Sequence, residues 1–237
     1  MLATMTELPT IVLVHGAFAS SSSWAKVIPL LTARGFPVVA VHCPLSSLAN
    51  DVAAVNRVLD MQHGPILLVG HSWGGAVITE AGNHPSVTGL VYIAAGAPDS
   101  GQSFNEWWSA GEPAPGGACI TPYGDDGYVT LTAEGFRRHF VQDLATDEAA
   151  LLHTTQGPFN QNSNNEKIST AAWEHKPSWF IIGKDDHMLL FDLEKNTAEH
   201  IGAKPLVLES GHVPMLSHPE EVTDWITDAA TELGHQN

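Results

Sequence analysis

One serine of the sequence lies in a glycine pattern that can carry acyl-transfer chemistry. Ser72 belongs to Gly70-x-Ser72-x-Gly74, which directly follows the apolar run 66–69. A strand that breaks into this pattern before a helix is the layout of a nucleophile elbow, in which a strained turn exposes one hydroxyl. Glycines suit such a turn because side chains at their positions would be too bulky. The pattern alone is a weak signal, so it needs a base, an acid and an oxyanion hole elsewhere in the chain.

A general base for Ser72 is expected late in the chain, because the order in such sites is nucleophile, acid, histidine. His212 follows the last predicted strand directly and therefore falls at the same sheet edge as Ser72. His218 is an alternative, although a His-Pro pair is more typical of a helix start. His187 also lies near a strand end, but a base there would break the expected order. We predict that His212 is the base.

The acid that orients this histidine is expected after the penultimate strand. Residues 181–186 end in two adjacent carboxylates, Asp185 and Asp186. Neighbouring residues in a loop cannot both point at one imidazole, so the other carboxylate caps the turn or faces water. We predict Asp186 as the acid and keep Asp185 as an alternative. Asp99 is a further alternative because it follows the fourth predicted strand.

Acyl transfer also needs two backbone N–H groups that hold the oxyanion. Trp73 follows the nucleophile and begins a helix whose dipole favours negative charge, so its N–H is one expected donor. The loop after the first strand supplies the other donor, since Gly16 lets that backbone approach closely and Ala17 then presents its N–H. The side chains at these two positions therefore shape the pocket. His15 is predicted to be structural.

Alternating strands and helices bring these residues to one edge of a sheet. Buried apolar runs predict the strands, and apolar residues at i, i+3 and i+4 predict the helices between them. This alternation predicts an α/β fold with a mostly parallel sheet and helices on both faces. Strands are expected at 10–14, 38–41, 66–69, 90–94, 178–182 and 206–208, and helices at 24–35, 48–64, 73–83, 192–200 and from 219 onward.

The alternation lapses in the middle of the chain, which divides it into three parts. We expect residues 9–97 and 177–233 to form the core, and residues 98–176 to form a small, mainly helical lid. Such an insertion falls over the carboxyl edge of the sheet, where α/β folds bind ligands. The candidate substrate contacts are Phe18, Trp107 and Trp108. Four other aromatic residues could line the pocket or only pack the lid onto the core: Phe104, Phe136, Phe140 and Phe159.

The composition limits the expected partners and location. Ten basic and 26 acidic residues give a formal net charge of −16, which repels phosphate backbones and anionic membranes, so we expect neither partner. Residues 1–9 lack the features of a signal peptide, and two cysteines are too few for a disulfide framework, which favours a cytoplasmic protein. No His-Glu-x-x-His or paired-cysteine spacing occurs, so we expect no metal and no cofactor. A homodimer is left open.

The ordered motifs resemble the α/β-hydrolase fold superfamily over residues 9–233, and within it the small esterases that include plant methylesterases and hydroxynitrile lyases. The resemblance implies a cofactor-independent hydrolase. Hydroxynitrile lyases carry a lysine directly after the catalytic histidine, where this chain has Val213, which argues against lyase chemistry. A serine at the elbow, where haloalkane dehalogenases have aspartate, argues against that activity. The matching features are His15-Gly16-Ala17, Trp24, Gly-x-Ser-x-Gly-Gly, the Gly-x-x-Asp loop at 183–186, and Gly211-His212 with Pro219.

The predicted function is hydrolysis of a small to medium neutral carboxylic ester through an acyl-enzyme intermediate. Ser72 attacks, His212 transfers the proton and Asp186 orients the imidazole. The same residues could cleave a lactone, an amide or a carbon–carbon bond. A receptor-like binding protein of the same fold is the alternative from another class, and labelling of Ser72 by a serine-directed phosphonate distinguishes it from an enzyme.

Overall fold

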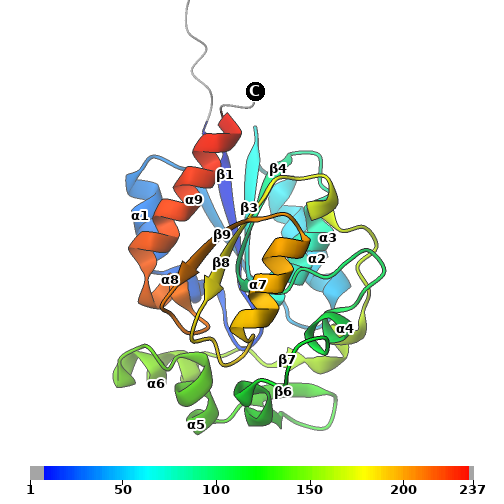
Figure 1. Ribbon diagram of the computed structural model, residues 1–237, viewed down its shortest axis with the longest axis vertical. Helices are drawn as coiled ribbons and strands as arrows, with labels where there is room; N and C mark the ends of the chain where they lie inside the picture. The colour runs from blue at the N-terminus through cyan, green and yellow to red at the C-terminus, as the bar shows by residue number, and fades with distance from the viewer. Residues whose placement is uncertain (1–7, 235–237) are drawn as a thin grey trace, which may run out of the picture.

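A computed structural model describes residues 8–234, which are built around a parallel six-stranded sheet (Figure 1). Each strand is parallel to its neighbours. The direction of the strand order reverses at β1, because β2 lies on one side of it and all later strands lie on the other. The order is β2 (Val38–Val41), β1 (Thr10–Val14), β3 (Ile66–Ser72), β4 (Val87–Ala95), β8 (Ser178–Gly183) and β9 (Lys204–Leu208).

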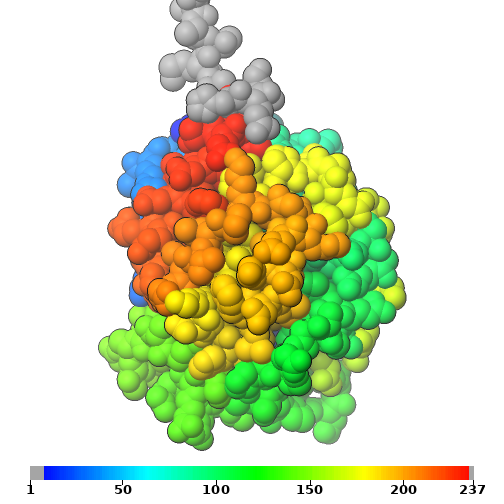
Figure 2. Space-filling view, viewed as in Figure 1, coloured from blue at the N-terminus to red at the C-terminus, as the bar shows by residue number. Residues whose placement is uncertain are grey.

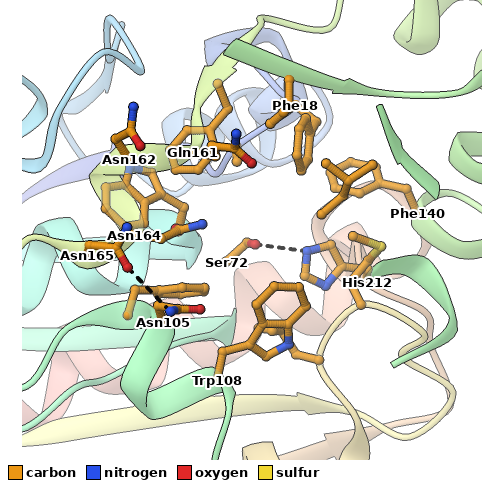
Figure 3. A pocket seen from close by; sticks show the side chains of 18 residues that line it. Phe18, Ser72, Asn105, Trp108, Phe140, Gln161, Asn162, Asn164, Asn165 and His212 are labelled. Carbon is orange, nitrogen blue, oxygen red and sulfur yellow. Dashed lines mark hydrogen bonds between the residues drawn. The ribbon is translucent and has the colours of Figure 1, made fainter. Parts of the chain in front are cut away.

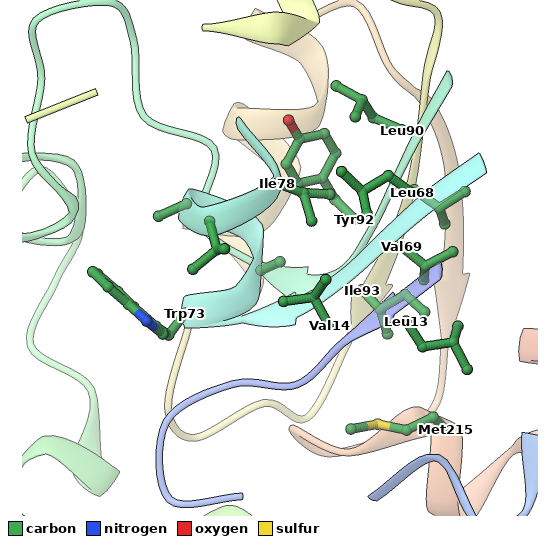
Figure 4. Close-up of a cluster of buried hydrophobic side chains, with 14 of the residues drawn as sticks. Leu13, Val14, Leu68, Val69, Trp73, Ile78, Leu90, Tyr92, Ile93 and Met215 are labelled. Carbon is green, nitrogen blue, oxygen red and sulfur yellow. The ribbon is translucent and has the colours of Figure 1, made fainter. Parts of the chain in front are cut away.

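The central strands are buried on both faces, which explains why their sequences are continuous apolar runs and do not alternate. Every residue of β1, β3 and β8 is buried, whereas the edge strand β9 is largely exposed. The register places apolar side chains of neighbouring strands side by side: Leu13 of β1 pairs with Val69 of β3, which in turn pairs with Val91 of β4. Figure 4 shows this apolar layer next to the helix that carries Trp73 and Ile78.

Helices cover both faces of the sheet because right-handed crossovers on the two sides of β1 place them on opposite faces. The first helix, α1 (Val27–Ala33), packs against the last, α9 (Pro219–Gly234), and Arg34 joins them by donating to Asp224 at 2.5 Å. On the other side of the sheet, two helices pack together (Figure 1). These are α2 (Leu48–Leu59) and α3 (Trp73–Ala81), and the remaining core helices are α7 (Phe191–His200) and α8 (Pro214–Ser217).

The α/β core predicted from the sequence is confirmed, but the helix expected at 48–64 ends at Leu59, the short helix α8 was not predicted, and the first helix differs. The expected helix at 24–35 is divided into a 3₁₀ turn, Ser21–Trp24, and α1. Pro29 explains the division, because proline is tolerated in the first turn of a helix but removes a hydrogen bond from its interior. A helix that started at Trp24 would place Pro29 in that interior.

Most of residues 98–176 lie below the carboxyl ends of the strands and cover the lower end of the core (Figures 1 and 2). The last part of this stretch runs up the side of the core, where the turn Ala172–Glu174 packs against α3. Besides helices, residues 98–176 contain a three-stranded antiparallel sheet, which the sequence did not predict. Its strands have two to four residues each, too short to give a period. The strands are β5 (Ile120–Pro122), β6 (Tyr128–Leu131) and β7 (Phe159–Asn160), and the helices are α4 (Phe104–Trp108), α5 (Ala133–Gly135) and α6 (Thr146–Thr154). There are also 3₁₀ turns at Pro115–Cys119, Gln161–Asn165 and Ala172–Glu174, and a π-helical turn at Phe136–Phe140.

Candidate active site

Ser72 ends β3 and is held in a strained backbone conformation. Its φ of 54° lies in the left-handed region, which is unfavourable for residues other than glycine. The surrounding backbones approach too closely for side chains: a Cβ on Gly74 would lie 2.6 Å from the Val14 carbonyl oxygen, and one on Gly16 would lie 2.7 Å from Cβ of Ser72. The two glycines therefore allow β1, its following loop and the start of α3 to close around the serine.

A chain of hydrogen bonds links this serine to a buried carboxylate. The Ser72 hydroxyl lies 3.0 Å from Nε2 of His212, and Nδ1 of His212 lies 2.6 Å from Oδ2 of Asp186. The other carboxylate oxygen of Asp186 accepts the N–H groups of Met188 and Leu189 at 2.6 and 2.9 Å. The carboxylate is thus fixed on both oxygens. An imidazole held in this way presents an unprotonated Nε2 to the serine hydroxyl.

His71 holds the backbone of His212 from the opposite side. Nε2 of His71 lies 2.7 Å from the carbonyl oxygen of His212 and must carry the proton, since a carbonyl can only accept. Burial, and then the nearby His212, lower the pKa of His71 well below its usual range. The two rings pack with their centroids 4.8 Å apart. His71 therefore positions His212 without placing a second positive charge beside it.

A buried glutamate lies behind the acid. Glu194 on α7 has no exposed surface, and its Oε2 accepts the N–H of Gly183 at 3.0 Å. Burial, and then the negative charge of Asp186, raise the pKa of Glu194 well above its usual range. The protonated form of the glutamate is therefore favoured, and its side chain anchors the end of β8, from which the loop to Asp186 departs.

Two backbone N–H groups face the cavity next to Ser72. Ala17 and Trp73 both line it, and within residues 8–234 neither N–H has a hydrogen-bond partner. His15 fixes the loop before Ala17, because its Nδ1 donates to the Gly16 carbonyl at 2.9 Å and its Nε2 accepts the N–H of Cys43 at 3.1 Å. Two free N–H groups beside a nucleophile can hold a developing oxyanion.

The cavity above Ser72 has a volume of about 340 Å³ and is mainly apolar (Figure 3). Phe18 contributes one wall and has a left-handed φ of 58°. Its ring packs edge-on against Phe140 and Phe159, with centroids 6.4 and 6.1 Å apart. The other apolar residues of the lining are Ala17, Trp73, Phe104, Trp108, Ile120, Val129, Met188 and Leu189.

The structure brings most of the sequence-predicted pocket residues together, but not Trp107. Phe18 and Trp108 line the cavity, whereas the Trp107 indole is 6 % exposed and donates to the hydroxyl of Thr197 on α7 at 2.9 Å. The substrate contact predicted for Trp107 is therefore not supported by its position, because successive helix residues point about 100° apart. Of the aromatic residues left open, Phe136 also lies outside the lining.

The alternative acids and bases lie elsewhere. Asp185 is exposed, and Asp99 pairs with Nε2 of His200 at 2.7 Å. His218 contacts the hydroxyl of its neighbour Ser217, and His187 contacts His139. None of these four side chains is hydrogen-bonded to Ser72 or His212 in the described part of the chain.

Comparison with known proteins agrees with this architecture. A model of the alpha/beta hydrolase family matches residues 11–225. The chain belongs to this family. It is 33% identical over 250 residues to a pyrethroid hydrolase of Sphingobium wenxiniae (93% of this chain, 87% of the relative), and 27% identical over 243 residues to methylesterase 2 of Arabidopsis thaliana (90% and 92%). The solved structure of a pyrethroid hydrolase from Sphingobium faniae superposes with a TM-score of 0.81 at 22% identity, over 95% of this chain and 98% of that chain. The family and fold predicted from the sequence are thus confirmed.

A cluster of carboxamides at the cavity was not found by sequence reasoning. Gln161 and three asparagines of the turn Gln161–Asn165 line the cavity, together with Asn105 of α4. The signal was present, since five of the six residues 160–165 carry carboxamides. A polar run in an insertion is ordinarily interpreted as a solvated loop, and only the fold brings it to the cavity.

Asp51 on α2 is a second residue that the sequence did not single out. Its carboxylate is buried and accepts the Trp73 indole N–H and the Leu45 backbone N–H, each at 2.8 Å. Burial raises the pKa of this carboxyl to about 6, although both hydrogen bonds act in the opposite direction. Asp51 thus fixes the Trp73 side chain, which forms part of the cavity wall next to Ser72.

Two further features of residues 8–234 concern potential metal ligands and potential membrane-spanning helices. No cluster of histidine, cysteine, aspartate or glutamate side chains in this part of the chain is arranged to bind a metal ion. None of its helices is both long enough and apolar enough to cross a membrane.

Proposed function

We propose that this alpha/beta hydrolase is a serine esterase that cleaves neutral carboxylic esters. The observation that carries the proposal is the continuous hydrogen-bond chain from Ser72 through His212 to Asp186, which opens into a mainly apolar cavity. The relatives named as a methylesterase and a pyrethroid hydrolase support the same class of reaction.

In the proposed reaction, Ser72 Oγ attacks the ester carbonyl while Nε2 of His212 takes the hydroxyl proton. The carbonyl oxygen becomes negative and is stabilised by the N–H groups of Ala17 and Trp73. Asp186 stabilises the imidazolium, which then protonates the leaving alcohol. Water, activated by the same imidazole, attacks the acyl-enzyme and releases the carboxylic acid together with the free serine.

The lining favours an uncharged substrate. Among the described residues, no lysine, arginine, aspartate or glutamate lines the cavity, so a charged group would be desolvated there without a partner. Phe18, Trp73 and Trp108 instead offer apolar surface to an acyl or alcohol chain.

The proposal is tested by the variant Ser72→Ala, measured with a chromogenic short-chain ester such as p-nitrophenyl butyrate. We expect kcat to fall by roughly a thousandfold or more, because the nucleophile is removed while the fold is kept. The exposed Ser109→Ala is the matched control and should retain full activity. Circular dichroism and Tm should be unchanged in both variants, and near-normal hydrolysis by Ser72→Ala would refute the proposal.

A further inference from the structure

The cavity is polar on one side, and this side belongs to the inserted lid. Figure 3 shows Asn105, Asn162, Asn164 and Asn165 opposite His212, with Ser72 between them. Gln161 also lines the cavity. We define these five residues as the carboxamide rim. All of them are uncharged and can both donate and accept hydrogen bonds.

The turn that carries most of the rim is held in place by hydrogen bonds of its backbone, which leave the cavity-facing carboxamides free. Asn160, just before the turn, accepts the backbone N–H of Asn162 with its side chain at 3.1 Å. The backbone N–H of Gln161 donates to the carbonyl of Gly127 at 3.1 Å, and that of Asn160 donates to the carbonyl of Leu45 at 2.9 Å. The turn is therefore tied both to the small sheet and to the core, so a ligand need not order it.

Several carboxamides of the rim remain available to a ligand. Nδ2 of Asn105 donates to Oδ1 of Asn165 at 3.3 Å, which joins α4 to the turn. In the described part of the chain, the side-chain amides of Gln161, Asn162 and Asn164 have no hydrogen-bond partner. Asn164 is half-buried and the other two are exposed, so all three amides are accessible to a ligand.

The carboxamide rim favours an uncharged ligand, because the rim carries no net charge and, among the residues that the structure describes, no charged side chain lies around it in the cavity. A carboxylate would favour a cationic partner, and an ammonium group would favour an anionic partner, but neither kind of side chain lines the cavity in residues 8–234. A hydroxyl group, which donates and accepts, matches a carboxamide at both of its polar atoms.

We propose that the carboxamide rim binds a hydroxyl group of the substrate, so that the preferred ligand is an apolar ester with a neutral hydroxylated end remote from the ester bond. This inference rests on the proposed esterase function for the position of the ester, but the binding preference itself requires no catalysis. The apolar walls hold the body of the substrate, and the rim fixes which end points away from Ser72. A uniformly apolar pocket would show the opposite preference, because it would leave the hydroxyl desolvated and unpaired.

The test measures binding in a Ser72→Ala background, in which ligands are not turned over. Two matched pairs cover both ends of the ester: ethyl hexanoate against ethyl 6-hydroxyhexanoate, and hexyl acetate against 6-hydroxyhexyl acetate, with eight-carbon homologues of each. Dissociation constants are obtained from the change in tryptophan fluorescence on binding, because two of the seven tryptophans, Trp73 and Trp108, line the cavity. We expect the hydroxylated member of at least one pair to bind about fivefold more tightly, the effect of one added hydrogen bond.

Substitution of the rim shows whether it causes the preference. In the same background, Gln161→Met combined with Asn162→Leu and Asn164→Leu nearly keeps the side-chain sizes and removes the three unpaired amides, so the alkyl ester should become the tighter ligand. Asn196→Leu is the matched control, since Asn196 is exposed on α7 outside the cavity, and it should keep the preference for the hydroxyl. Equal or tighter binding of every alkyl ester without rim substitutions, or a preference that survives the triple substitution, would overturn the inference. Ester hydrolysis by the protein with Ser72 intact reports separately on the proposed function.

Discussion

Asp51 is a buried carboxylate whose ionisation affects the stability of the cavity wall. Its pKa of about 6, against 3.8 for an ordinary aspartate, means that the folded protein keeps a proton that the unfolded chain has released. Between these two values the folded state binds more protons, so the free energy of unfolding falls as the pH rises.

The variant Asp51→Asn should therefore be compared with the natural protein at several pH values. Asparagine removes the ionisation but has only one acceptor oxygen for two donors, so either the Leu45 N–H or the Trp73 indole N–H is left without an acceptor. We expect this to cost about 1 kcal/mol at every pH. From pH 4 to pH 7 we expect the stability of Asp51→Asn to rise relative to that of the natural protein in urea unfolding. Asp125→Asn, at an exposed site, is the control. Parallel stability profiles for the natural protein and Asp51→Asn would contradict the assignment.

Glu194 allows a second prediction at this scale, because a neutral carboxyl and a carboxamide are close in shape. Glu194→Gln keeps an acceptor for the Gly183 N–H, so kcat/KM for p-nitrophenyl butyrate should stay within about threefold of the original value. Glu194→Leu leaves that N–H buried and unpaired next to the loop of Asp186, and should lower kcat/KM about tenfold. If Glu194→Gln lowered kcat/KM as much as Glu194→Leu does, the prediction would be wrong, and a negative charge at position 194 would be required for activity.

At the scale of elements, one segment of residues 98–176 holds both the loop that carries Asp186 and the loop that carries His212. Nε2 of Gln142 donates to the carbonyl of Asp185 at 2.8 Å, and Oδ2 of Asp143 accepts the N–H of Gly211 at 2.9 Å. The residues held in this way directly precede Asp186 and His212. The insertion is thus connected to the geometry of the site as well as to its cavity.

The double variant Gln142→Ala, Asp143→Ala should loosen these loops. We expect kcat to fall about tenfold to a hundredfold, since small displacements of catalytic groups are costly, while Tm changes little because both side chains lie near the surface. Asp125→Ala, in an exposed turn of the same insertion, is the control. An unchanged kcat would contradict this expectation, because it would show that the two loops keep their geometry without these two hydrogen bonds.

The sequence predicts the elements that carry strong local signals. Ser72 and the strand before it could be found because the apolar run and the glycines of the elbow are local requirements of the turn. The substrate contact predicted for Trp107 does not match its position, because an aromatic side chain packs equally well in a core or a pocket, and only the helix geometry decides between them. The carboxamide rim and Asp51 depend on contacts between distant segments, which composition and spacing do not contain.

At the scale of the whole molecule, the net charge of −16 should lower kcat/KM for negatively charged esters relative to neutral ones. An acidic protein repels anions over a distance set by the ionic strength. For a neutral ester, kcat/KM should be nearly independent of salt. For a matched ester with a carboxylate, kcat/KM should be lower and should rise as NaCl is increased from 10 to 300 mM. A carboxylate ester that reacts best at low salt would contradict this expectation.

The central claim is that Ser72 is the nucleophile of a hydrolytic site, and covalent labelling tests it most directly. The protein is treated with a fluorophosphonate and analysed by intact mass and peptide mass spectrometry. The account predicts one adduct, on Ser72, absent in Ser72→Ala and formed far more slowly in His212→Ala, because the histidine activates the hydroxyl. Labelling at another residue, or equal labelling of Ser72→Ala, would contradict the account.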